Sequence, residues 1–446
     1  MKKLIILFAA LLVSAKAQTQ ATAPPPIVLS PVIPGDVNIT AKTVSIDAFQ
    51  PDFDVYSWNT FIALNWPVGP DGKTDPRQQI GARGDNDTVW EHYRDVRDVF
   101  LPNGKKPSWN GSPQEPPVPV KGFKKGMAVL SQVGKTPNVL TDASQPFNTG
   151  PLIDQNGNYT RFQILINKTM FDYILNNSLY SKAGQKVFTP PVNFTCGSLA
   201  SGSKPAVEGA IMVKASWKVI DPSEQSQFHS EEVVVCSPPV KEGGKPVCEL
   251  KTMGLVGLHI AHKTKSASQW LWSTFEHVDN APTDADVRSG NLKPKYNFYN
   301  PKCTAQACPA NAIPPRPWVP ALVSSFHSQV VRNNMFNLPI YAASASARNG
   351  DAWKLLLGVN PNSVWRNYEL ISTMWPTDPG NCAAVPGDPL GAPAPTFMAN
   401  TTLETYLQKS NPPQPNVSSQ CIECHSNATM TVPVPSDFTY ILQRAQ

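Results

Sequence analysis

Three residues near the carboxyl end of the sequence have the types and spacing needed to hold a metal-containing group. Cys421, Cys424 and His425 form the pattern Cys-x-x-Cys-His. Two thiols three residues apart lie on one face of a helical turn, where both can bond to one porphyrin, and the imidazole that follows can bind its iron. The pattern predicts covalent attachment of one haem through the two cysteines, with His425 as the proximal ligand.

A disulfide between the two cysteines, or half of a zinc site, is the competing interpretation. Structural zinc needs a second pair of cysteine or histidine ligands at suitable spacing, and the sequence contains no other Cys-x-x-Cys and no Cys-x-x-His. A redox-active disulfide normally lies in a βαβ unit, for which the short C-terminal stretch has no room. Haem attachment is the favoured interpretation.

The amino-terminal residues have the features of a secretory signal. Lys2 and Lys3 precede an apolar run, Leu4–Val13, and a small-x-small cleavage pattern, Ala15-Lys16-Ala17. We expect cleavage after Ala17 and a periplasmic or secreted bacterial protein. The apolar run is too short to span a bilayer, so no integral membrane protein is expected. Export agrees with the haem motif, because bacteria attach haem covalently outside the cytoplasmic membrane.

Composition limits the class of protein further. The 446 residues include 46 prolines, and only 16% of them are charged, which is typical of a loop-rich secreted protein. Removal of Lys2, Lys3 and Lys16 with the signal lowers the formal net charge from +5 to +2. A nucleic-acid partner therefore has no electrostatic support.

Six cysteines remain outside the motif, and an even number in an oxidising compartment predicts disulfides. Two apolar runs joined by a turn-rich stretch predict a hairpin that brings Cys236 to Cys248. Cys303 and Cys308 could close a short loop, which leaves Cys196 for Cys382. Six cysteines allow 15 pairings, so the assignment rests on these local patterns.

Periodicity predicts an α+β fold, with a large β-rich antiparallel domain, peripheral helices and a short helical C-terminal haem-attachment segment. The expected strands are Tyr159–Ile166, Ala210–Ile220, Glu232–Cys236, Val247–Ile260, Gln269–Val278 and Trp365–Trp375. The expected helices are Asp52–Trp66, Thr88–Phe100, Lys168–Tyr180, Ala321–Phe336 and Thr401–Lys409, the last from a capping-box pattern. Asp154–Asn158 is expected to form a turn rather than a calcium loop.

The predicted domain organisation has four parts. Residues 1–17 are the signal peptide and 18–50 a leader rich in proline, alanine and threonine. Residues 51–376 form the mixed α/β main domain around the sheet, and 377–446 form a linker and the haem segment.

The motif resembles the attachment site of c-type cytochromes, which implies a haem protein with redox activity. In the small cytochrome c domain the motif lies near the start and a methionine ligand follows many tens of residues later, whereas here Met430 is the only downstream methionine. The long exported chain, with Gly257–His262, Trp270–Asn280 and one C-terminal motif, is also similar to uncharacterised exported bacterial monohaem proteins.

The ligand on the distal side of the iron must then come from upstream residues. The candidates are His259, His262 and His277, followed by Met374 and Met398. His259 and His262 would share a face on a helix but lie on opposite faces of a strand.

Two classes of function follow from the motif and the length. The first is electron transfer through a six-coordinate haem to a redox partner protein. The second is a haem-dependent peroxidase or oxidase with an open distal site, where Arg332 or Arg366 could polarise a small oxidant. A third interpretation is that the large domain binds a substrate or partner and the haem segment drains electrons from it.

Overall fold

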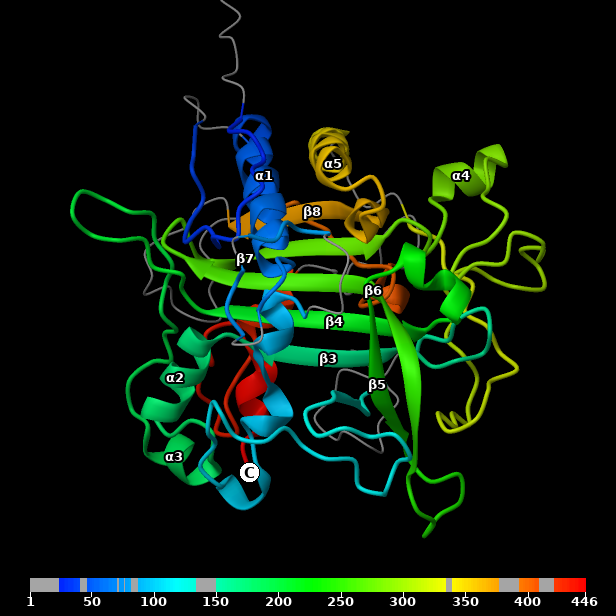
Figure 1. The fold of residues 1–446 in the computed structure, drawn as a ribbon, viewed down its shortest axis with the longest axis horizontal. Coiled ribbons are helices and arrows are strands. Elements are labelled where there is room, and N and C mark those ends of the chain that lie inside the picture. The colour runs from blue at the N-terminus through cyan, green and yellow to red at the C-terminus, as the bar shows by residue number, and fades with distance from the viewer. Residues whose placement is uncertain are drawn as a thin grey trace, which may run out of the picture.

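A single nine-stranded sheet organises the computed structural model, which describes residues 24–40, 46–69, 72–75, 77–81, 87–133, 150–333, 339–376, 393–408 and 421–446 (Figure 1). The strands are β1 (Arg94–Asp95), β2 (Val129–Leu130), β3 (Arg161–Ile166), β4 (Ile211–Val219), β5 (Ser230–Ser237), β6 (Val247–Thr264), β7 (Ala267–His277), β8 (Tyr368–Pro376) and β9 (Pro393–Ala394). The α-helices are α1 (Ile46–Leu64), α2 (Lys168–Asn176), α3 (Lys182–Val187), α4 (Asp284–Ser289), α5 (Pro339–Val359) and α6 (Cys421–Ser426).

The strand order is β1-β3-β4-β6-β7-β8-β9, and neighbouring strands along this path run antiparallel. β6 is 18 residues long, so its first half pairs with β5 and its second half pairs with β4 and β7. β5 also pairs with β2, and this pair is parallel. The prediction of an α+β fold built on a large antiparallel sheet is confirmed.

One face of the sheet is covered by α1 and α5. Figure 1 shows α1 crossing in front of the strands, with α5 beside it. Apolar residues of α1 recur every three or four positions and pack with α5 on inward residues of β4, β6, β7 and β8. The α1 members of this cluster are Val55, Trp58, Phe61 and Ile62.

The opposite face is covered by α2 and by residues 421–446. Their apolar side chains form one cluster with residues of β3, β4, β7 and β8. The C-terminal residues contribute Ile422, Met430, Phe438, Ile441, Leu442 and Ala445. The segment drawn in red in Figure 1 is therefore an integral part of the core, although it follows every strand in the sequence.

Four predicted strands, Tyr159–Ile166, Ala210–Ile220, Glu232–Cys236 and Val247–Ile260, correspond to β3–β6, and Gln269–Val278 corresponds to β7. The strand expected at Trp365–Trp375 is β8, but it starts only at Tyr368, because Val364–Asn367 forms a 3₁₀ helix. The predicted helices at Asp52–Trp66 and Lys168–Tyr180 are α1 and α2. Asp154–Asn158 forms the expected turn, in which the Asp154 carboxylate accepts from the amides of Asn156 and Asn158.

The helix predicted at Thr88–Phe100 is wrong. The segment contains two 3₁₀ helices, η1 (Val89–His92) and η2 (Val96–Asp98), separated by β1. β1 pairs with β3 through Arg94 and Asp95, so strand pairing overrides the local helical pattern.

The helix predicted at Ala321–Phe336 is also wrong over its described part, 321–333. Here the backbone bonds to distant loops instead: the amide of Val330 donates to Phe298 and that of Ser328 to Ile153. At Thr401–Lys409 the described residues form turns and the short 3₁₀ helix η7 (Thr405–Leu407), whose N-cap is Glu404 rather than Thr401. The Asn400 side chain accepts from the amides of Thr402 and Leu403 in the turn before it. α5, which the sequence did not predict, begins at Pro339.

Two of the predicted disulfides are confirmed, Cys236–Cys248 and Cys303–Cys308. The first joins directly opposed residues of the β5–β6 hairpin. Cys196 is disulfide-bonded, while Cys382, its predicted partner, lies outside the described residues. The predicted signal peptide and residues 377–392 of the predicted linker Pro376–Pro395 lie outside them as well.

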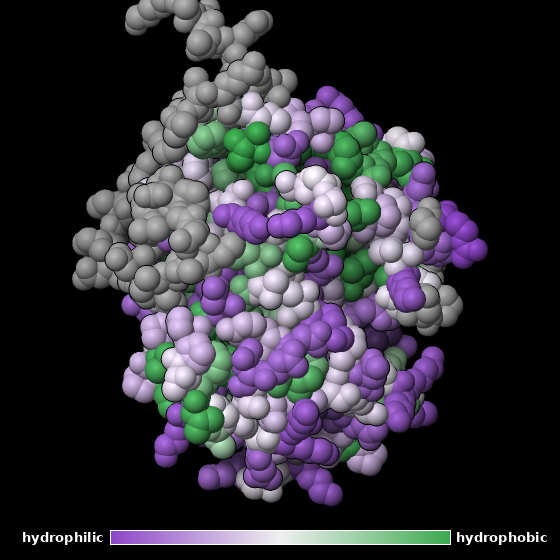
Figure 2. All heavy atoms as spheres, turned by 90° about the vertical axis from the view of Figure 1, so that its left-hand side faces the viewer, coloured by the Kyte–Doolittle hydropathy of each residue, from purple (hydrophilic) through white to green (hydrophobic). Residues whose placement is uncertain are grey.

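Residues 24–40 of the predicted leader contain no helix or strand, and they pack on the main body through buried Ile27 and Val37. None of the described helices combines the length and apolar character that a membrane crossing requires. On the face drawn in Figure 2, hydrophilic and hydrophobic residues are intermixed, and the lower part is mainly hydrophilic.

Candidate functional site

The Cys-x-x-Cys-His motif forms helix α6, a single short helix at the start of the C-terminal segment. Cys421 and Cys424 are both half-buried. Ile422, between them, is fully buried in the apolar cluster and anchors the helix against the sheet. The hydroxyl of Tyr440 donates to the carbonyl of Cys424 over 2.7 Å, which ties the last residues of the chain to the motif.

The imidazole of His425 is oriented by the backbone and by two aromatic rings. Its Nδ1 lies 2.7 Å from the carbonyl oxygen of Phe438. A carbonyl can only accept, so Nδ1 carries the proton and the lone pair lies on Nε2. The ring centroids of Trp272 and Tyr440 lie 4.4 and 5.3 Å from that of His425.

This arrangement fits the group that the motif implies. Histidines that bind metals usually donate their other ring N–H to a carbonyl or carboxylate, which fixes the tautomer and the ring orientation. His425 has this contact, and the two thiol-bearing residues lie within one helical turn of it. Cys421, Cys424 and His425 would hold the haem.

A buried ion pair fastens the C-terminal segment to the sheet. Lys263 of β6 and Asp437 are both about 1% exposed, and Lys263 Nζ donates to the Asp437 carboxylate. Asp437 also accepts from the amide of Phe194 over 2.7 Å, and Lys263 donates to the side chain of Asn193 over 2.7 Å. Since Phe438 follows Asp437 directly, the ion pair also fixes the carbonyl that holds His425.

The structure separates the three candidate distal histidines. In the β6–β7 register, Ala261 pairs with Trp272 and His259 pairs with Thr274. Side chains two residues apart on a strand share a face, so His259 lies on the same face as Trp272 and α6. Its Nε2 lies 2.9 Å from the Glu404 carboxylate and its Nδ1 2.9 Å from the Thr274 hydroxyl.

His262 and His277 point to the opposite face. His262 contacts the hydroxyl of Tyr56 in α1 and the carbonyl of Glu208. His277 stacks on Phe228 and lies 2.9 Å from the carbonyl of Gln227. Burial lowers the pKa of each histidine to about 4. As predicted for a strand, His259 and His262 thus face opposite ways, and only His259 of the three shares the face that carries α6.

Both candidate methionines pack near the motif. Met374 and Met398 belong to the same buried cluster as Ile422 and Trp272. The candidate cations are placed differently. Arg332 is held by Glu276 and Glu369 at 2.8 Å each. Arg366 is exposed beside Pro361, just beyond the end of α5.

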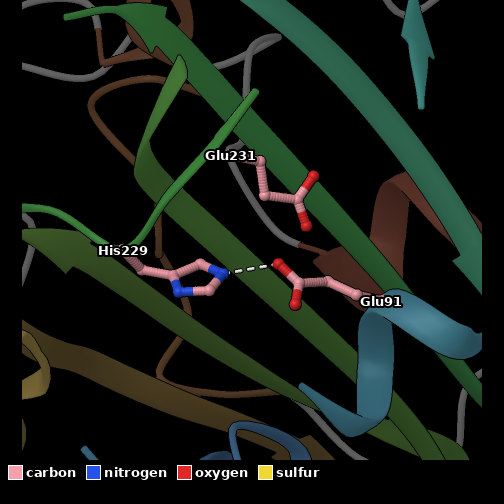
Figure 3. A group of neighbouring side chains, drawn as sticks. All are labelled: Glu91, His229 and Glu231. Atoms are coloured by element: carbon pink, nitrogen blue, oxygen red, sulfur yellow. Dashed lines mark hydrogen bonds and ion pairs between the residues drawn. The ribbon is translucent and has the colours of Figure 1, made fainter. Parts of the chain in front are cut away.

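The sequence analysis missed a second group of side chains, shown in Figure 3. Glu91 of η1, His229 and Glu231 each offer one ligand atom, and these atoms lie within 4.8 Å of one another. His229 Nε2 lies 2.5 Å from Glu91 Oε1. The His-x-Glu spacing at the start of an apolar strand was the available signal, because alternate strand residues point the same way. Nothing in the sequence points to Glu91 as the third member.

Burial governs the ionisation of this group. It raises the pKa of Glu91 and, together with the neighbouring Glu91 carboxylate, raises the pKa of Glu231 well above its ordinary value. Burial also lowers the pKa of His229 to about 4, so the imidazole is neutral at pH 7. The three side chains line one cavity of about 830 Å³.

No family model, curated protein or solved structure matches this chain.

Proposed function

We propose that the protein is an exported monohaem c-type cytochrome that transfers electrons to a redox partner protein. The observation that carries the proposal is the Nδ1 contact of His425 with the carbonyl of Phe438, which presents Nε2 as an iron ligand beside Cys421 and Cys424. A covalently bound haem c would supply reversible one-electron chemistry at this place.

The residues around the motif position α6 and the His425 ring. Ile422 anchors α6 in the core, and Trp272 and Tyr440 restrict the rotation of the His425 ring. A proximal ligand that is held rigidly in both redox states lowers the reorganisation that electron transfer requires. The rigid packing therefore favours an electron carrier.

The sixth ligand is proposed from the same face of the sheet. His259, Met374 and Met398 lie on this face or in its apolar cluster, whereas His262 and His277 bond to groups on the other side. A ligand from this set would make the haem six-coordinate and low-spin.

The alternative is a haem-dependent peroxidase or oxidase with an open distal site. Such an enzyme needs a polar or cationic group to polarise the oxidant. Arg332 is already engaged by two carboxylates, and Arg366 lies beside Pro361. These placements favour electron transfer over oxidant activation.

An exported location is part of the proposal. The disulfides Cys236–Cys248 and Cys303–Cys308 agree with an oxidising compartment, because such bonds are rare in the bacterial cytoplasm.

The test is haem staining after denaturing electrophoresis of protein made in a host that attaches haem c. The parent chain should carry covalent haem, and the Cys421→Ala/Cys424→Ala variant should carry none. Cys303→Ser/Cys308→Ser is the matched control, since it also removes two cysteines but leaves α6 intact. Covalent haem that survives loss of both motif cysteines would refute the proposal.

Absorption spectra distinguish the two haem classes. Electron transfer predicts a low-spin spectrum that carbon monoxide does not change, and replacement of the sixth ligand among His259→Ala, Met374→Ala and Met398→Ala should convert it to high-spin. A parent protein that is high-spin and binds carbon monoxide at once would instead support the peroxidase or oxidase alternative.

A further inference from the structure

The cavity that contains Glu91, His229 and Glu231 lies on the face of the sheet opposite the haem motif. Its wall includes Trp365, which belongs to the cluster packed under α1 and α5, and the His229 ring stacks on Trp365 with the ring centroids 4.7 Å apart. At about 830 Å³ the cavity is large enough for a small molecule. It is therefore a separate site from the one that holds His425.

The three side chains are held in place by their surroundings. Glu91 Oε2 accepts from both the amide and the hydroxyl of Thr88, at 2.6 and 2.9 Å, which leaves Oε1 directed toward His229. The backbone amide of His229 donates to the Tyr368 hydroxyl over 3.0 Å. Metal ligands in proteins are commonly oriented by such neighbouring hydrogen bonds.

The spacing of the ligand atoms suits a metal ion. All three atoms lie within 4.8 Å of one another. An ion that binds nitrogen and oxygen at ~2.0–2.2 Å needs its ligand atoms about 3–4 Å apart. Figure 3 shows Glu231 pointing toward the other two side chains.

The charge of the cavity favours a cation as well. Four carboxylate side chains line it among the described residues, against one lysine, Lys124; the four are Asp87, Glu91, Glu231 and Glu232. A concave surface lined by one sign of charge concentrates ions of the other sign. A bound cation would also offset the electrostatic repulsion between the Glu91 and Glu231 carboxylates.

We propose that Glu91, His229 and Glu231 bind one divalent transition-metal ion of the zinc or manganese type. An imidazole together with two carboxylates suits these ions better than calcium or magnesium, which prefer oxygen ligands alone. Three protein ligands leave coordination positions open, as in catalytic zinc sites. These positions face the cavity, so the ion would take water or an oxygen-bearing small molecule as a further ligand.

The experiment uses the full haem-loaded chain, treated with a chelator and then dialysed against Zn²⁺ or Mn²⁺ in turn. Bound zinc or manganese is measured by elemental analysis, which separates it from haem iron, and affinity is measured by calorimetry. We expect one equivalent bound. Glu231→Gln should weaken binding by more than the ~10–100-fold that loss of an outer partner costs.

The matched control is Glu249→Gln, which makes the same charge change on β6 at an exposed residue and should leave binding unchanged. Thermal unfolding shows whether each variant is folded. Added metal should raise the melting temperature of the parent but not that of Glu231→Gln. The proposal is overturned if the parent binds less than one equivalent, or if Glu231→Gln and Glu249→Gln bind equally well.

Discussion

The buried ion pair between Lys263 and Asp437 gives the sharpest test of how the C-terminal segment, residues 421–446, is attached to the sheet. Lys263→Met keeps a long apolar side chain but removes the charge, which leaves the Asp437 carboxylate buried, at about 1% exposure, without its cation. Loss of one partner of a buried pair costs about 3–5 kcal/mol. Three kcal/mol alone reduces the folding equilibrium constant by about two powers of ten.

The assay is chemical denaturation followed by intrinsic fluorescence, together with limited proteolysis of residues 421–446. Lys168→Met is the matched control, because Lys168 pairs with Asp172 over 2.6 Å at the surface, where both side chains are substantially exposed. An exposed pair contributes only ~0–1 kcal/mol. The first variant should therefore lose at least three times as much stability as the second and should release the C-terminal segment to protease.

A double variant separates charge from packing. Asp437 has a φ of 53°, a left-handed backbone conformation that asparagine tolerates. Lys263→Met/Asp437→Asn should recover part of the stability lost in Lys263→Met, since no unpaired charge remains. The reasoning is refuted if Lys263→Met costs no more than Lys168→Met, or if the double variant is less stable than Lys263→Met alone.

Three further predictions concern stability. Burial raises the pKa of the Asp54 carboxyl from 3.8 to about 6. The protein is therefore most stable with respect to this group below pH 3.8, and it loses about 3 kcal/mol of unfolding free energy as the pH rises through 6. Asp54→Asn should remove that loss in unfolding measured from pH 4 to 8, and an unchanged pH slope would contradict the prediction. His262 behaves in the opposite way, because burial lowers its pKa from 6.5 to about 4. Its contribution to the free energy of unfolding is present above pH 6.5 and is lost as the pH falls toward 4. In acid titration, His262→Gln should therefore lose less stability than the parent. Cys236→Ser/Cys248→Ser removes a disulfide between residues 12 apart in the sequence and should lower the free energy of urea unfolding by about 3 kcal/mol. No change would show that the hydrogen bonds between β5 and β6 alone hold the hairpin.

The sheet could be predicted because its strands carry their own signal. β6 is rich in valine, leucine and isoleucine, and it is bounded by turn residues on both sides. The same local pattern placed Cys236 opposite Cys248 and set His259 and His262 on opposite faces. These features depend on residues that are close in the sequence.

The errors arose where distant contacts decide the conformation. Arg94 and Asp95 form a strand only because β3 lies beside them. The segment at 321–333 gives its backbone hydrogen bonds to loops near Ile153 and Phe298. α5 was detectable in principle, since Pro339 begins an alanine-rich run, and proline is favoured in the first turn of a helix.

The candidate sites differ in the same way. Cys421, Cys424 and His425 are contiguous, so the motif could be found in the sequence, but the carbonyl of Phe438 that orients His425 could not. Glu91 is more than a hundred residues from His229 in the sequence, and the two meet only because η1 lies beside the start of β5. Spacing alone cannot reveal such a group.

The C-terminal segment has two roles in the folding and maturation of the chain. It carries the thiols to which a porphyrin would be joined, and it also fills the apolar cluster beneath β3, β4, β7 and β8. Because these residues are synthesised after every strand of the described sheet, that half of the core stays open until they arrive. Enzymes of haem attachment would therefore meet the motif on an unfinished molecule, and closure of the core would follow as the last step of maturation.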